Sequence, residues 1–264
     1  MSSILRGGSV AAGNFFFKYR NAIFPVVFAA FLIVMRPRMM FGDPVIDRAL
    51  VICGFAVALA GELVRLSTIG FEYIERGGKQ GKVYASFLVR KGVYGISRNP
   101  MYVGNMLIGI GIVMASGAPA AYVTVIPFFA FVYHAITSAE EEFLHKKFGA
   151  AYEEYCAHVP RFLPALSGFR EAFSGIRFDA RRPFKQDLST ITWIAMVLTA
   201  LPFWRAYFLH GWDFARRPAV QTAVAELAIV ALSGMLAFLK KRKSPLFYPR
   251  EERDREKQTV SGSV

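Results

Sequence analysis

Six long apolar segments constrain what this chain can fold into more than any other feature of the sequence. They cover roughly residues 22–35, 49–66, 101–116, 118–137, 188–209 and 219–239. A helix perpendicular to a bilayer needs about 20 apolar residues to cross the hydrocarbon core, so the first and third segments are short for a span. Only Gly117 and its neighbours separate the third segment from the fourth, ahead of Pro119, which predicts a helical hairpin. We predict an all-α, multi-pass transmembrane protein with about six spans.

The composition agrees with a membrane protein. Of 264 residues, 54% are hydrophobic, Phe accounts for 25 and Tyr for 11, and the mean hydropathy is +0.35. A soluble domain of this length rarely reaches such values. The net charge of +13 does not indicate nucleic acid, because the basic residues lie between the apolar segments rather than along one stripe, and no nucleic-acid motif accompanies them.

The distribution of Lys and Arg predicts the orientation of the spans. With a cytosolic N-terminus, the segments 1–21, 65–100, 138–187 and 240–264 face the cytosol and carry 26 of the 32 basic residues. Cytosolic loops of membrane proteins carry such an excess of positive charge. We therefore expect both termini in the cytosol. No small-residue cleavage site follows the first apolar segment, so we expect that segment to stay in the mature protein as an anchor.

One expected cytosolic segment, residues 88–105, reads LVRKGVYGISRNPMYVGN. Pro100 is suited to the first turn of a helix, and Asn99 is then placed as its N-cap. Arg98, Asn99 and Tyr102 gather where the free N–H groups of that helix point, an arrangement that suits an anionic group. The alternative is an interfacial anchor, with Arg98 reaching lipid phosphates and Tyr102 in an aromatic belt.

A second expected cytosolic segment, residues 139–164, begins with three carboxylates at the end of the fourth apolar segment: Glu140, Glu141 and Glu142. A carboxylate at the membrane is costly and indicates a binding site, the alternative being a solvated acidic helix end. His134, Thr137 and Glu141 are spaced to share one helical face. We expect no metal site, since the HExxH motif and cysteine pairs are absent.

Taken together, the two segments resemble the isoprenylcysteine carboxyl methyltransferase and phospholipid methyltransferase group of membrane enzymes. That group has a G-x-Y turn, R-(H or N)-P-x-Y-x-G, a helical hairpin, then E-E-x-x-L-x-x-x-F-G-x-x-Y-x-x-Y and V-P-R. The matching residues are Gly92, Tyr94, Arg98, Asn99, Pro100, Tyr102, Gly104, Glu140, Glu141, Leu144, Phe148, Gly149, Tyr152, Tyr155, Val159, Pro160 and Arg161. The resemblance covers about residues 45–165.

The resemblance implies an enzyme that transfers the methyl group of S-adenosylmethionine to a lipophilic acceptor entering from the bilayer. It implies a cytosolic cofactor pocket formed around the helical hairpin. By motif position, the cofactor-binding residues are Leu88, Val89, Tyr94, Asn99, Pro100, Tyr102 and Glu140. The predicted catalytic residues are Arg98, Asn99, His134 and Glu141. A cofactor that carries its own activated methyl group requires mainly alignment from the protein.

Two departures from the family pattern bear on the acceptor. Position 99 is Asn where prenylcysteine enzymes usually have His, and Ile136 stands where the pattern of those enzymes has an Arg. Both changes weaken the case for a prenylated cysteine carboxylate, so a prenylcysteine, a phospholipid amine and a thiol all stay open as acceptors. An amine or thiol must lose a proton, and His134 is the nearby histidine that we hypothesise as the base.

Two other functions remain as alternatives. Sterol reductases share the hairpin, but they carry an acid and a Cys before K-Y-G-x-x-W, where this chain has Phe148-Gly149 and Tyr152. A non-catalytic membrane scaffold could also keep the fold. As domains we predict a methyltransferase-like core at 1–167, a basic linker at 168–187, two further transmembrane helices at 188–243 and a charged, disordered tail at 244–264.

Overall fold

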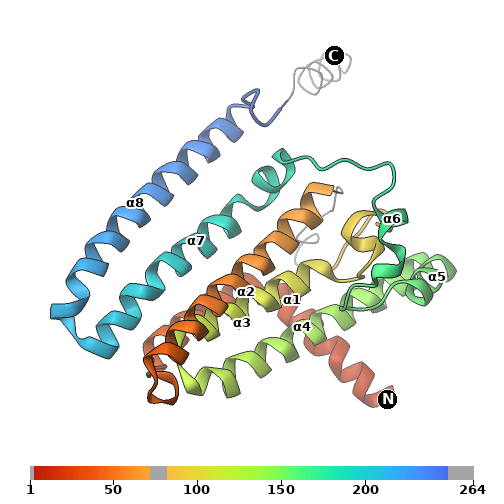
Figure 1. Ribbon diagram of the computed structural model, residues 1–264. Coiled ribbons are helices and arrows are strands. Elements are labelled where there is room, and N and C mark those ends of the chain that lie inside the picture. The colour runs from red at the N-terminus through yellow and green to blue at the C-terminus, as the bar shows by residue number, and fades with distance from the viewer. Residues whose placement is uncertain (1–2, 72–81, 249–264) are drawn as a thin grey trace. The chain divides into compact units, whose positions relative to one another are not determined.

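The computed structural model describes residues 3–71 and 82–248, and within these ranges every regular element is a helix (Figure 1). The α-helices are α1 (Ser3–Val34), α2 (Pro44–Phe71), α3 (Pro100–Ser116), α4 (Pro119–Phe148), α5 (Ala150–His158), α6 (Phe169–Ala172), α7 (Arg181–His210) and α8 (Trp212–Lys241). Short 3₁₀ turns lie at η1 (Met40–Gly42), η2 (Gly92–Gly95) and η3 (Leu166–Gly168). The predicted all-α class is confirmed.

Four of the described helices, α2, α4, α7 and α8, are long and apolar enough to cross a membrane. A fifth candidate is α1, which bends by 80° between Gly7–Arg20 and Ala22–Val34. The helix α3 is apolar but has only 17 residues, short of the length of a perpendicular span. The chain is thus an integral membrane protein with four or five candidate spans, and the third predicted segment is a shorter helix.

The chain divides into two compact units, Met1–Phe178 and Asp179–Val264, which are described separately. In the first unit, α3 packs chiefly along α2, and α4 packs chiefly along α1 (Figure 1). The predicted hairpin joins α3 to α4 through Gly117, whose φ of 61° lies in the left-handed region that favours glycine. Pro119 then opens α4, as its fixed φ favours the first turn of a helix.

Glycines allow α2 and α3 to approach closely. A Cβ added to Gly54 or Gly111 would overlap the backbone of the facing helix, at Ala115 and Ala58 respectively. Gly61 faces the carbonyl oxygen of Gly104 in the same way. Small residues at such crossings let helices in membranes gain van der Waals contact. This packing fixes the position of the N-terminus of α3, where the first motif lies.

We predict that Gly111→Ala destabilises the protein, whereas Gly234→Ala on α8 does not. The new Cβ at position 111 overlaps the backbone of Ala58, and overpacking of this kind costs about 1–3 kcal/mol. A Cβ at position 234 meets nothing within 4 Å, so alanine there only improves helix propensity. Thermal unfolding in detergent checks this, and equal melting temperatures for the two variants would contradict it.

Aromatic side chains fill the contact between α1 and α4. The ring of Phe16 meets that of Phe128 edge-on at 6.3 Å, and the ring of Phe24 lies 5.5 Å from that of Tyr133. Edge-on and tilted aromatic pairs of this kind add stability beyond the area they bury. One hydrophobic cluster at this contact consists of Phe17, Val132 and Ile136, and Tyr102 of α3 packs against it. We call it the helix cluster.

The second unit is a helical hairpin of α7 and α8, turned at Gly211, whose φ is 78°. Hydroxyl groups tie the two helices together: Thr192 and Ser233 are 2.8 Å apart, and Thr199 donates to Glu226 at 2.7 Å. Such interhelical hydrogen bonds stabilise helix pairs in membranes.

The helices α6 and the start of α7 fall within the predicted linker 168–187. The predicted division into core, linker, two helices and tail stays a prediction. Residues 249–264 of the predicted tail lie outside the described residues.

Candidate functional site

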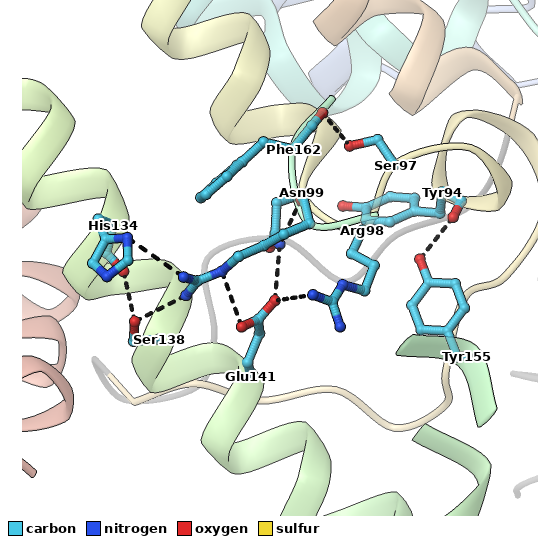
Figure 2. Close-up of polar contacts among 10 residues, drawn as sticks. Tyr94, Ser97, Arg98, Asn99, His134, Ser138, Glu141, Tyr155 and Phe162 are labelled. Atoms are coloured by element: carbon cyan, nitrogen blue, oxygen red, sulfur yellow. Dashed lines mark hydrogen bonds and ion pairs between the residues drawn. The ribbon is translucent and has the colours of Figure 1, made fainter. Parts of the chain in front are cut away.

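The two motifs meet just before the start of α3, through hydrogen bonds between their backbones. The N–H of Arg98 donates to the carbonyl of Pro160 at 2.9 Å, and the N–H of Ala165 donates to the carbonyl of Ile96 at 2.9 Å. The hydroxyl of Ser97 donates to the carbonyl of Phe162 at 2.9 Å (Figure 2). These bonds hold residues 96–98 against residues 160–165, so the second motif covers the first.

Glu141 on α4 is the centre of the polar contacts at this junction (Figure 2). Its carboxylate lies 3.5 Å from Nη2 of Arg98 and 3.0 Å from Nε of Arg161. The side-chain amide of Asn99 donates to it at 3.3 Å. All three ion-pair side chains are at most 25% exposed, so these charges interact in a partly desolvated environment. One carboxylate therefore joins both motif segments to the end of α4.

Asn99 occupies the predicted N-cap position of α3, with Pro100 in the first turn, but its side chain does not cap the helix. Its amide nitrogen instead donates to Glu141 and, at 3.1 Å, to the carbonyl of Arg161. Asn99 is buried, and its amide N–H groups are satisfied by a carboxylate and a carbonyl. Both acceptors are distant in the sequence, so a local sequence pattern does not reveal them. Asn99 thus links three segments.

Arg161 extends the contacts of Glu141 along α4. Its Nη2 donates to the hydroxyl of Ser138 at 2.9 Å, and its Nη1 lies 3.4 Å from Nδ1 of His134, which is exposed. Ser138, rather than Thr137, shares the Arg161 contact with His134 and Glu141, since Thr137 is completely buried. Arg161 was not predicted as a site residue. Its place in the V-P-R ending of the motif was the available signal.

Glu140 makes a separate contact on another side of α4. The hydroxyl of Tyr102 donates to its carboxylate at 2.5 Å, and Arg20 of α1 interacts with it electrostatically. Successive residues of an α-helix point about 100° apart, which is why Glu140 and Glu141 have different partners. The ring of Tyr102 lies 5.6 Å from that of Tyr133. Sequence patterns gave no sign of a role for Arg20, which lies in the expected cytosolic segment 1–21.

The turn before α3 rests on a second hydrophobic cluster, formed by Tyr152, Tyr155 and Val159, which we call the loop cluster. Leu88 packs against it, and the hydroxyl of Tyr155 donates to the carbonyl of Tyr94 at 2.6 Å. Burial raises the pKa of Tyr155, so this hydroxyl stays protonated and remains a donor.

The predicted cofactor-binding residues divide between the two clusters. Leu88 packs on the loop cluster and Tyr94 is bonded to one of its members, whereas Tyr102 packs on the helix cluster and bonds to Glu140. Asn99 lies in the junction with Glu141, directly before Pro100, which is buried. Val89 is half-buried beside Leu88 in the chain.

Three buried polar atoms in this region have no hydrogen-bond partner among the described residues: Nε of Arg98, the hydroxyl of Thr137, and Nε of Arg161, which is ion-paired with Glu141. Burying a polar group without a partner is costly. An orphaned guanidinium nitrogen next to the motif indicates a place for an acceptor group of a ligand.

A further ionic cluster lies between α2 and α3. Glu62 and Arg65, one turn apart on α2, are paired at 3.3 Å, and Arg65 also donates to the side chain of Asn105 on α3. Both charged residues are buried. Our orientation count placed Arg65 in a cytosolic loop, which is wrong: α2 continues to Phe71 and buries it. Without Arg65 the expected cytosolic side still carries 25 basic residues against six.

Residues 50–151 match the sequence model of a family described as phospholipid methyltransferase. This range contains α3, the hairpin, Glu140 and Glu141. The resemblance inferred from the two motifs is confirmed: this part of the chain is similar to the phospholipid methyltransferase family.

Two named relatives share a shorter stretch with the chain. The cobalt-zinc-cadmium resistance protein CzcN of Cupriavidus metallidurans is 36% identical over 85 residues, and the nickel-cobalt-cadmium resistance protein NccN of Alcaligenes xylosoxydans xylosoxydans is 34% identical over 85 residues. Each match covers 31% of this chain and 38% of the relative, so the chain spans well under half the length of either protein. No solved structure matches the chain.

Proposed function

We propose that this protein transfers the methyl group of S-adenosylmethionine to a lipophilic acceptor held in the membrane. The observation that carries the proposal is the pair of adjacent carboxylates on α4: Glu140 is bonded to Tyr102, and Glu141 is bonded to Arg98 and Asn99. Through them, both halves of the motif reach one end of the α3–α4 hairpin. The family match over residues 50–151 supports the same reaction class.

The residues at the junction suit the charges of this cofactor. S-adenosylmethionine has an amino-acid carboxylate, an ammonium group and a cationic sulfonium. Arg98, whose Nε lacks a partner among the described residues, suits the carboxylate. Glu140 suits a ribose hydroxyl or the ammonium group, and the rings of Tyr102 and Tyr133 suit the sulfonium.

When bound, the cofactor supplies an activated methyl group that is transferred by in-line displacement. A bound cofactor would give its methyl carbon to the acceptor, and the electron pair of the carbon–sulfur bond would stay on sulfur. The role of the chain is to align the reacting atoms, which can supply about 7–11 kcal/mol of the barrier reduction. The Glu141 network serves this role by fixing the start of α3 against residues 160–165.

Among lipophilic acceptors, the contacts favour a class other than a prenylated cysteine. Ile136, which stands where prenylcysteine enzymes have an Arg, is fully buried in the helix cluster and offers no charge to an acceptor carboxylate. Asn99, in place of His, is bonded to Glu141. We therefore propose an amine or thiol of a lipid as the acceptor. We also propose that the site faces the cytosol, as the charge distribution favours.

The proposal is tested with purified protein reconstituted in lipid. Calorimetry should detect binding of S-adenosylmethionine, and radiolabelled cofactor with added membrane extract should yield a labelled lipid that mass spectrometry identifies. Binding of NADPH without binding of S-adenosylmethionine would instead support the reductase alternative.

We predict that His134→Ala lowers methyl transfer by about 100-fold, because an amine or thiol acceptor needs a base and His134 lies exposed beside Arg161. His158→Ala is the matched control, since His158 is also exposed but lies next to the backbone carbonyl of Glu154 in its own helix, at 2.9 Å. Turnover is measured from pH 6 to 9. Full activity of His134→Ala over that range would remove His134 from the mechanism.

A further inference from the structure

A groove of about 970 Å³ runs along the α7–α8 hairpin. Its apolar lining includes Leu188, Trp193, Met196, Val230 and Ala237. The groove belongs entirely to the second unit, outside the residues that match the methyltransferase family. Neither the motifs nor the proposed reaction accounts for it.

One end of the groove is strongly basic. Because α7 and α8 are antiparallel, the start of α7 and the end of α8 lie at the same end of the hairpin (Figure 1). Lys240, Lys241 and Lys243 line the groove there. Tyr248 also lines it, with the ammonium group of Lys185 over its ring at 4.1 Å. The groove is therefore cationic at one end and apolar along its length.

The length of the apolar part fits a hydrocarbon chain. From Lys240 back to Val230, α8 runs about 15 Å at 1.5 Å per residue. Half the hydrocarbon core of a bilayer is also about 15 Å thick. Gly234 leaves the wall without a side chain, and Ser233 is bonded to Thr192, so its hydroxyl has a partner within the wall. A straight acyl chain suits this surface.

We propose that the groove binds an anionic phospholipid, with its headgroup phosphate on Lys240, Lys241 and Lys243 and an acyl chain along Met196 and Val230. Basic pockets between transmembrane helices recognise anionic headgroups in this way. A zwitterionic lipid would bring its own cation against three lysines, and a free phosphate would leave the apolar wall without a partner. The assignment is independent of the methyltransferase proposal.

The test uses Trp193, which lines the groove, as the probe. In full-length protein with Trp204→Phe and Trp212→Phe, Trp193 is the remaining tryptophan of the three in the chain. Its fluorescence is quenched in bilayers by brominated phosphatidylglycerol or, separately, by brominated phosphatidylcholine. The ratio of the two apparent affinities gives the preference for the anionic lipid.

We expect phosphatidylglycerol to bind about 100-fold more tightly than phosphatidylcholine, since each of the three lysines near an anionic headgroup contributes about a factor of five. Lys240→Gln with Lys241→Gln should remove most of that preference. The matched control is Arg216→Gln with Arg217→Gln, which removes the same charge at the start of α8, the opposite end of the hairpin. That control should keep the preference.

Equal quenching by both lipids in the parent protein would overturn the proposal. So would a preference that survives the lysine changes or falls equally in the arginine control, because either result would show general charge attraction. Inorganic phosphate is also added at about 10 mM, well above the Kd of a weak phosphate site. If the preference for the anionic lipid is then lost, the lysines bind a soluble anion instead.

Discussion

Glu141→Gln is expected to lower methyl transfer by about 100-fold or more. The carboxylate of Glu141 holds Arg98 at 3.5 Å and Arg161 at 3.0 Å, and it accepts the side-chain amide of Asn99. Glutamine keeps the size but removes the charge, so the two guanidinium groups face each other without compensation. A displacement of about 1 Å in a site that works by alignment costs about 100-fold in rate.

The same change should destabilise the protein only moderately, by about 1–3 kcal/mol, because the ion pairs are partly exposed. Glu142→Gln is the matched control. It removes the same charge one residue further along α4, where Glu142 pairs with the exposed Lys146 at 3.0 Å. Turnover and thermal unfolding are measured for both variants. Similar losses of turnover in both would show that Glu141 has no special role.

Glu140→Gln is expected to raise the Kd for S-adenosylmethionine by about 10- to 100-fold. A hydrogen bond to a charged group contributes about 1.5–3 kcal/mol, and the neutral amide removes that charge. Tyr102→Phe keeps the aromatic ring but removes the 2.5 Å hydrogen bond to Glu140, so its effect should be smaller, at about fivefold. Calorimetry on protein in lipid measures both values.

Glu226→Gln provides the control for the loss of a carboxylate inside a helix pair. Glu226 accepts from Thr199 in the second unit, outside the family match. Glu226→Gln should leave the Kd for S-adenosylmethionine unchanged. Near-normal affinity in Glu140→Gln, with the protein folded, would contradict the assignment of Glu140 to the cofactor site.

The class of fold followed from the sequence because it depends on local composition. Apolar length predicts helices that cross a bilayer, and Pro119 after Gly117 predicts the hairpin turn. The exception was the end of the second helix. Because Arg65 is charged, the sequence predicted that it lies in a loop. In the structure it is buried within α2, where it pairs with Glu62 and donates to Asn105.

The motifs also identified the family without a structure, and the match over residues 50–151 confirms that resemblance. The predicted site residues stay predictions, but their geometry shows what a motif leaves out. A motif marks Asn99 and Glu141 as separate positions, whereas the structure joins them across 42 residues of chain. Asn99 looked like a helix cap because caps are local, and its side chain instead meets a carboxylate on another helix.

The sequence by itself determined the apolar helices, the motif residues next to two of them, and the charge bias from which we predict their orientation. Only the tertiary structure decided that Arg161 completes the contacts of Glu141, that Arg20 interacts with Glu140, and that lysines line one end of a groove on α7 and α8. The physical reason is the range of the interactions. Periodicity and capping act within a few residues, whereas ion pairs and packing join segments that no local pattern relates.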